Sequence, residues 1–173
     1  MSQAVRIVLL LIAAGLALTA VIAVAGWWME PHRRMGRALR QVLGGPVDAM
    51  AMDVSRGQGA ALRVDEGKIG VMRGFGDTGL VFDIDELIGA ELIFDGHVAA
   101  RVFRGEGRLP LNNISPSASR VALRLVFDDL RDPEFLLEMW SPADGAADDP
   151  AAADAVASAR RWFARAEAVI RRG

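Results

Sequence analysis

Residues 88–103, IGAELIFDGHVAARVF, decide the fold that this sequence predicts. Apolar residues recur at every second position on both sides of Asp95-Gly96, a dipeptide that favours the tight turn of a β-hairpin. If Leu92 pairs with Ala100, Glu91 lies opposite Arg101 as a cross-strand ion pair. The residues expected on the inward face are Ile88, Ala90, Leu92, Phe94, Val98, Ala100 and Val102.

The same period of two extends over residues 60–140 and gives seven strand-like segments. The last two segments flank Asp132-Pro133, which favours a turn. Pairing Phe127 with Phe135 across this turn places Arg124 opposite Glu138. The charged residues of these strands are therefore expected to fix the register rather than to form a reactive site.

The C-terminal segment changes to a helical period and predicts a helix over residues 150–172. Asp149 is the expected N-cap, and Pro150 suits the first helical position. Arg161, Arg165 and Arg172 are expected to face away from the core. The expected buried stripe consists of Ala152, Val156, Ala159, Trp162, Phe163, Ala166, Val169 and Ile170.

Seven strands followed by one long helix resemble bacterial proteins with a pleckstrin-homology-like (PH-like) domain. The residues that carry the resemblance are 82–92 (FDIDELIGAEL) and 123–133 (LRLVFDDLRDP). It implies an α+β domain over residues 60–173, a seven-stranded antiparallel PH-like barrel or sandwich closed by the C-terminal helix. Lipid-binding PH domains carry a basic loop between their first two strands, but here that loop is DEGK, residues 65–68. Headgroup binding by the domain is therefore not expected.

The chain begins with a long apolar run, residues 7–26. A helix of about 20 such residues is long enough to cross a bilayer, so we expect a transmembrane helix over residues 5–28. The alternative is a signal peptide cleaved after Ala25, because Ala23 and Ala25 fit a small-x-small site. That alternative would send the domain out of the cytoplasm.

Charge asymmetry around this run predicts its orientation. Only Arg6 precedes it, whereas several arginines follow it, and positive flanks stay cytoplasmic. We therefore expect a single-pass protein of the cell inner membrane with a cytoplasmic C-terminal domain and a basic juxtamembrane stem and linker, residues 29–59. The residues expected at the interface with the lipid bilayer are Trp27, Trp28, Arg33, Arg34, Arg37 and Arg40.

The stem also has a helical pattern, with apolar Met35, Leu39 and Val42 opposite its arginines. Such a helix could lie on anionic lipid, or its arginines could serve only to set topology. The second interpretation is preferred, because three apolar residues make a thin stripe.

Net charge is unevenly distributed along the chain. Residues 1–45 contain five arginines and one glutamate, a net charge of +4, and residues 46–173 contain fifteen basic and twenty-one acidic residues, a net charge of −6. An acidic domain without a basic stripe concentrated in its sequence is a poor candidate for binding nucleic acid. The chain has no cysteine, which fits a reducing compartment.

No catalytic or cofactor motif is recognisable in the sequence. His32 and His97 have no serine, cysteine or acidic partner at a known motif spacing. The carboxylates of Asp83, Asp85 and Glu86 lack the pattern of a calcium loop and are expected to cap a short turn. We therefore expect no enzyme activity, no cofactor, no metal and no small-molecule substrate.

A long loop, residues 105–119, is the expected contact surface for a protein partner, because loops of this length are often functional. The expected contact residues are Leu109, Asn112, Asn113 and Ile114. The sequence thus favours a non-enzymatic membrane-tethered scaffold or protein-binding module. The alternatives are an exported or periplasm-facing envelope protein with a binding or enzymatic role, and a hydrolase with a dispersed site.

Overall fold

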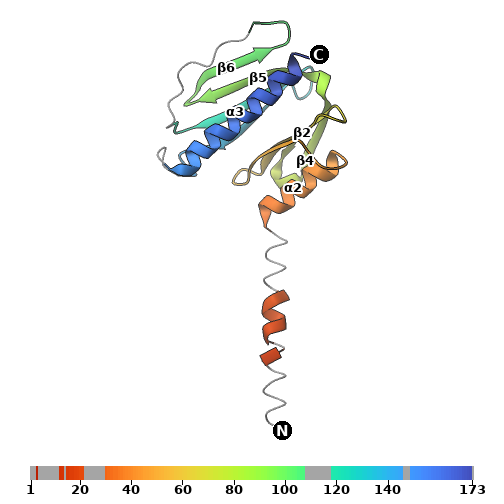
Figure 1. The fold of residues 1–173 in the computed structure, drawn as a ribbon, viewed down its shortest axis with the longest axis vertical. Coiled ribbons are helices and arrows are strands. Elements are labelled where there is room, and N and C mark those ends of the chain that lie inside the picture. The colour runs from red at the N-terminus through yellow and green to blue at the C-terminus, as the bar shows by residue number, and fades with distance from the viewer. Residues whose placement is uncertain are drawn as a thin grey trace. The chain divides into compact units, whose positions relative to one another are not determined.

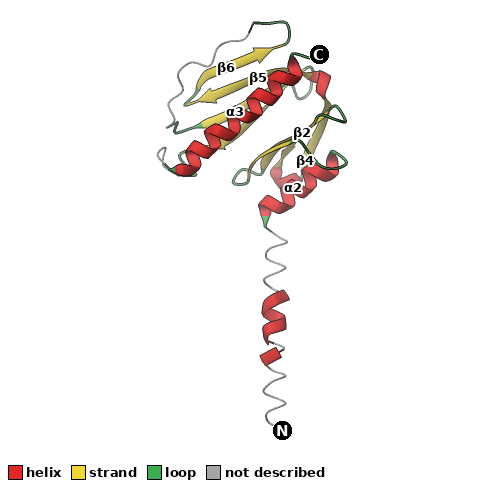
Figure 2. Ribbon diagram, in the orientation of Figure 1, coloured by secondary structure: helices red, strands yellow, loops and turns green. Residues whose placement is uncertain are grey.

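The structure is a computed structural model that describes residue 3 and residues 12–13, 15–21, 30–107, 118–145 and 149–172. The chain divides into two compact units, Met1–Arg34 and Met35–Gly173. From Pro31 onward the described elements are α2 (Pro31–Val42), β1 (Ala49–Asp53), β2 (Gln58–Arg63), β3 (Lys68–Arg73), η1 (Gly74–Gly76), β4 (Thr78–Asp83), η2 (Ile84–Glu86), β5 (Leu87–Phe94), β6 (His97–Phe103), β7 (Val121–Phe127), β8 (Glu134–Trp140) and α3 (Pro150–Ile170) (Figures 1 and 2).

The described strands form two four-stranded antiparallel sheets, which corrects the predicted seven-stranded PH-like barrel or sandwich. The first sheet has the order β1-β2-β3-β4, and the second has the order β6-β5-β7-β8. In the second sheet β5 lies between β6 and β7, so the strands do not follow one another as a simple meander. The eighth strand, β1, was missed because its sequence, AMAMD, contains neither β-branched nor aromatic residues.

The first sheet is covered on both faces. Four consecutive residues are buried in the middle of β2 and again in the middle of β3. Leu62 and Ile69 face the main core, whereas Ala61 and Met72 belong to a second apolar cluster with Met35 and Leu39 of α2. A strand that is buried on both faces has no strict alternation of apolar and polar residues, and the sequence signal is therefore weak here.

The predicted register of the first hairpin is confirmed. Leu92 lies opposite Ala100, and Glu91 lies opposite Arg101. Two residues of the predicted inward face are wrong, however: Ile88 is half-buried, with Leu87 buried in the core instead, and Val98 is 40% exposed. Register irregularities between Leu87 and Gly89 and between Leu92 and Ile93 explain the changes, because an extra residue in a strand moves the following side chains to the other face.

The predicted register of the last hairpin is wrong by two residues. Leu125 lies opposite Phe135, and Arg124 lies opposite Leu136. The centre of the turn lies one residue earlier than predicted, and the Asp129 carboxylate stabilises it by accepting the N–H groups of both Arg131 and Asp132, at 2.7 and 2.9 Å.

Helix α3 begins and packs as the sequence predicts. Asp149 is the N-cap, and its carboxylate accepts the Ala151 N–H at 2.8 Å. The helix contacts β5, β7 and β8 of the second sheet (Figure 1). Trp162 and Phe163 are among the largest fully buried side chains of the described residues. The buried residues are Ala152, Val156, Ala159, Trp162, Phe163, Ala166 and Ile170.

From Met35 onward, helix α2 packs against the first sheet. Met35 and Leu39 are each only 1% exposed, and Leu43 follows them into the same cluster. Val42, which the sequence placed on the apolar stripe, is 48% exposed instead. The apolar face of this segment therefore contacts protein, and the lipid-facing alternative considered for it is wrong.

The predicted transmembrane helix over residues 5–28 is corrected by the structure. Within the described residues, no helix is both long and apolar enough to cross a membrane. The prediction of a single-pass inner-membrane protein is corrected with it.

Candidate functional site

Strand β4 forms an outer edge of the first sheet and pairs only with β3 within the described residues. Ile84 donates its N–H to the Gly67 carbonyl at 2.8 Å, which fixes the alternation of hydrogen bonds along this pair. The backbone N–H and C=O groups of Leu80 are therefore hydrogen-bonded to β3. Those of Gly79 and Val81 point away from β3. Unpaired backbone groups of this kind can pair with an added strand.

Leu43, directly after helix α2, packs on the neighbouring strand β3. A side chain at Gly70, the residue opposite Val81, would meet Leu43 at 3.3 Å. Val81 itself is 41% exposed. We use the name β4 edge for the outward backbone groups of Gly79 and Val81 together with the side chain of Val81.

The β4 edge is flanked by carboxylates at both ends. Asp77 precedes the strand, and Asp83, Asp85 and Glu86 follow it. Asp83 is paired with Lys68 at 3.1 Å, whereas Asp77 and Asp85 form no ion pair within the described residues. A segment that pairs with β4 would therefore meet negative charge at its ends.

Two of the three carboxylates at the end of β4 take the structural role that the sequence predicted. Asp83 and Glu86 form a capping box around η2, in which the Asp83 N–H donates to Glu86 Oε2 at 2.6 Å. No cluster of three possible metal ligands occurs within the described residues.

The candidate contacts predicted from the sequence are not brought together in the described residues. Arg33, Arg34, Arg37 and Arg40 are exposed on α2, and Arg33 forms an ion pair with Glu30 at 3.0 Å. The remaining candidates lie outside the described residues: Trp27, Trp28, Leu109, Asn112, Asn113 and Ile114.

A group of residues at the β5–β6 turn has the composition of a hydrolase site but not its connectivity. The Ser119 hydroxyl donates to Asp95 Oδ1 at 2.6 Å, and the Arg120 N–H donates to the same oxygen at 2.8 Å. These bonds, led by that of Ser119, hold the pKa of the exposed Asp95 carboxyl below its ordinary value, and the nearby His97 contributes. In a nucleophilic triad the histidine lies between serine and aspartate, whereas here Ser119 bonds to Asp95 directly.

Strand β8 is joined to the first sheet through a polar network at the β1–β2 turn. Asp53 accepts Arg56 Nη1 at 2.7 Å and the Ser55 hydroxyl at 2.5 Å. Arg56 Nη2 continues to Ser141 Oγ at 3.0 Å and to Glu138 at 3.2 Å. Burial raises the pKa of Asp53, but the hydrogen bonds from Ser55 and Arg56 outweigh it and lower that pKa below its ordinary value.

A second bridge joins the end of β3 to the other end of β8. Arg73 pairs with Asp132 at 2.9 Å, donates to the Glu134 carbonyl at 3.2 Å and lies over the Phe135 ring, 5.3 Å from its centroid. Both networks consist of satisfied ion pairs at a seam between sheets, so their function is to hold the sheets together.

Comparison of the chain with protein-family models, with curated proteins and with solved structures finds no match. The resemblance to PH-like proteins therefore stays a prediction. Sequence reasoning missed the β4 edge because the strand order that leaves β4 at the edge of its sheet could not be read from the sequence. The signal that could have found it is the small outward residue, Gly79, two positions before Val81 in a strand flanked by acidic residues.

Proposed function

We propose that the unit formed by residues 35–173 is a non-enzymatic protein-binding module that adds an extended segment of a partner to β4. The observation that supports this proposal is the outward pair of backbone groups at Gly79 and Val81 beside the exposed side chain of Val81. Strand addition supplies affinity through main-chain hydrogen bonds and specificity through alternate side chains.

The surroundings of the edge define the partner that would fit. Residues of the added strand on the same face as Val81 would contact its exposed side chain, which favours β-branched side chains there. Asp77 at one end and Asp85 at the other favour lysine or arginine at the ends of the segment. The partner is therefore an extended, β-branched segment with basic ends.

A display library of short peptides with alternating Val, Ile or Thr and basic ends tests this function. Selected peptides are expected to protect the Gly79 and Val81 amides from hydrogen exchange. The variant Val81→Lys is expected to weaken binding by about tenfold or more, because it removes apolar contact and adds charge.

Val98→Lys is the matched control, since Val98 is 40% exposed and also lies in an edge strand, β6. This variant should bind the selected peptides as the unmodified protein does. A library that yields no peptide preferring the unmodified protein over Val81→Lys would contradict the proposal. Peptides that bind without protecting the Gly79 and Val81 amides would contradict it as well.

A further inference from the structure

The C-terminal half of helix α3 and the turn that follows it carry a row of exposed arginines. Arg161 and Arg165 are four residues apart on one face of the helix, and Arg172 lies in the turn directly after it, where its N–H donates to the Val169 carbonyl at 3.0 Å. These three arginines are called the stripe below. Arg160 is exposed beside it.

The side chains of these arginines differ from those of arginines in and between the two sheets. Arg56, Arg73 and Arg124 each reach a carboxylate, whereas the guanidinium groups of Arg160, Arg161, Arg165 and Arg172 form no hydrogen bond or ion pair within the described residues. Arg171 is the exception on the helix, because it pairs with Glu167 at 3.1 Å. Like charges four residues apart on a helix repel each other, and no carboxylate offsets the pair Arg161 and Arg165.

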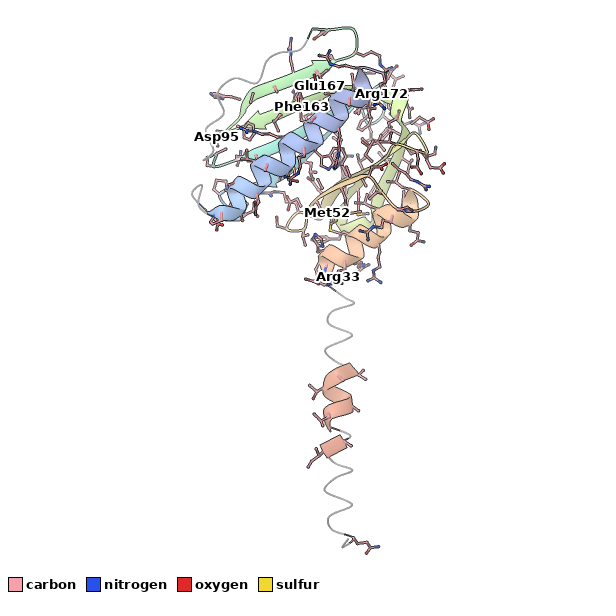
Figure 3. The ribbon with its side chains drawn as sticks, in the orientation of Figure 1. Arg33, Met52, Asp95, Phe163, Glu167 and Arg172 are labelled. Atoms are coloured by element: carbon pink, nitrogen blue, oxygen red, sulfur yellow. The ribbon has the colours of Figure 1, made fainter. Side chains whose placement is uncertain are left out.

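The packing of α3 fixes the position of the stripe, and the backbone of a partner can approach it closely. Trp162 and Phe163, on the opposite face, are 2% and 1% exposed and anchor the helix to the second sheet. Exposed Ala168 lies within the stripe and exposed Ala164 beside it, so a partner can approach the helix closely between the arginines. Figure 3 labels Phe163 on α3 and Glu167 and Arg172 toward its C-terminal end.

We propose that this stripe binds an acidic helical segment of a protein partner, whose carboxylates face Arg161, Arg165 and Arg172. Residues 46–173 have a net charge of −6, with fifteen basic and twenty-one acidic residues, and this charge repels a long polyanion such as nucleic acid. A short helix with three carboxylates at the spacing of these arginines carries far fewer negative charges than a nucleic acid. The acidic domain therefore repels it less. The inference is independent of the β4 edge.

The probe is a synthetic alanine-rich helical peptide with glutamates at positions i, i+4 and i+11, titrated against the full chain by fluorescence anisotropy. The triple variant Arg161→Gln/Arg165→Gln/Arg172→Gln is expected to bind it about tenfold more weakly and with a smaller salt dependence. The charge-matched control is Arg40→Gln/Arg101→Gln/Arg131→Gln, which removes exposed arginines elsewhere and should bind nearly as the unmodified protein.

Three results would overturn the proposal. A scrambled peptide of the same composition could bind equally well, which would show nonspecific charge attraction. The control triple variant could lose as much affinity as the α3 variant. A short DNA duplex could bind through the same arginines more tightly than the peptide, which would assign the stripe to nucleic acid. Val81→Lys should leave peptide binding to α3 unchanged, so this test is separate from that of the β4 edge.

Discussion

Gly57, in the turn between β1 and β2, occupies a position with no space for a side chain. Its φ is +66°, and a Cβ there would lie 2.6 Å from the backbone nitrogen of Phe75, which donates to the Gly57 carbonyl. Gly57→Ala should therefore lower the free energy of unfolding by about 2–4 kcal/mol, from the left-handed backbone and the steric clash together.

Gly67→Ala separates these two causes. Gly67 has a similar φ of +63°, but a Cβ there would meet nothing within 4 Å. The alanine variant should lose only about 1–2 kcal/mol, the penalty for the left-handed conformation. Urea unfolding of both variants measures the difference, and equal losses would show that the contact between Gly57 and Phe75 is not restrictive.

Asp53 should make the stability of the protein depend on pH in the acid range. Its pKa is lower in the folded protein than its ordinary value of 3.8, so the unfolded chain binds the proton more readily. The stabilisation is present above about pH 4 and is lost as the pH falls through the folded pKa. Asp53→Asn should flatten the decline in stability measured by urea unfolding between about pH 6 and pH 2.5. Asp85→Asn, which changes an exposed carboxylate without an ion pair, is the control and should follow the unmodified protein.

Helix α2 stabilises the first sheet through its buried face. Leu39→Ala should lower the free energy of unfolding by about 2–5 kcal/mol, since Leu39 is 1% exposed and packs near Gly59. Val42→Ala, on the exposed side of the same helix, should change it by less than about 0.5 kcal/mol. Chemical denaturation compares the two, and a neutral Leu39→Ala would mean that α2 is not part of the folded core.

The elements that could be predicted from the sequence are those with a clear period and clear end signals. These are the β5–β6 hairpin, with Asp95-Gly96, and α3, with Asp149-Pro150. Strand β1 could not be predicted, because alanine and methionine alternate on a buried and a half-buried face and leave no polar period. The register of β8 depended on the hydrogen bonds of Asp129, which the sequence does not specify.

The candidate site was harder to predict than the fold, because it depends on what remains unpaired after folding. An outward backbone group at Gly79 is visible only when the strand order places β4 at an edge. The exposure of Val42 depends on the rotation of α2, and the choice between Val42 and Leu43 as the buried residue is set by contact with Gly70.

In the unit Met35–Gly173, the two apolar clusters share the first sheet and should unfold together. Ala61 belongs to one cluster and its neighbours Ala60 and Leu62 to the other, so neither can open without disturbing the same strand. A chain of residues 30–173 should give coincident urea transitions by far-ultraviolet circular dichroism and by fluorescence of Trp140 and Trp162. Two separate transitions would show that α2 and its cluster unfold independently.

The outer position of β4 also bears on how this protein behaves at high concentration. An unpaired strand is a template for pairing with other copies, and charged residues near such a strand are a common protection against aggregation. Here Asp77 and Asp85 flank the strand and Asp83 ends it, so each approaching copy meets negative charge. Replacing these aspartates with asparagine should therefore lower the solubility of the protein during purification.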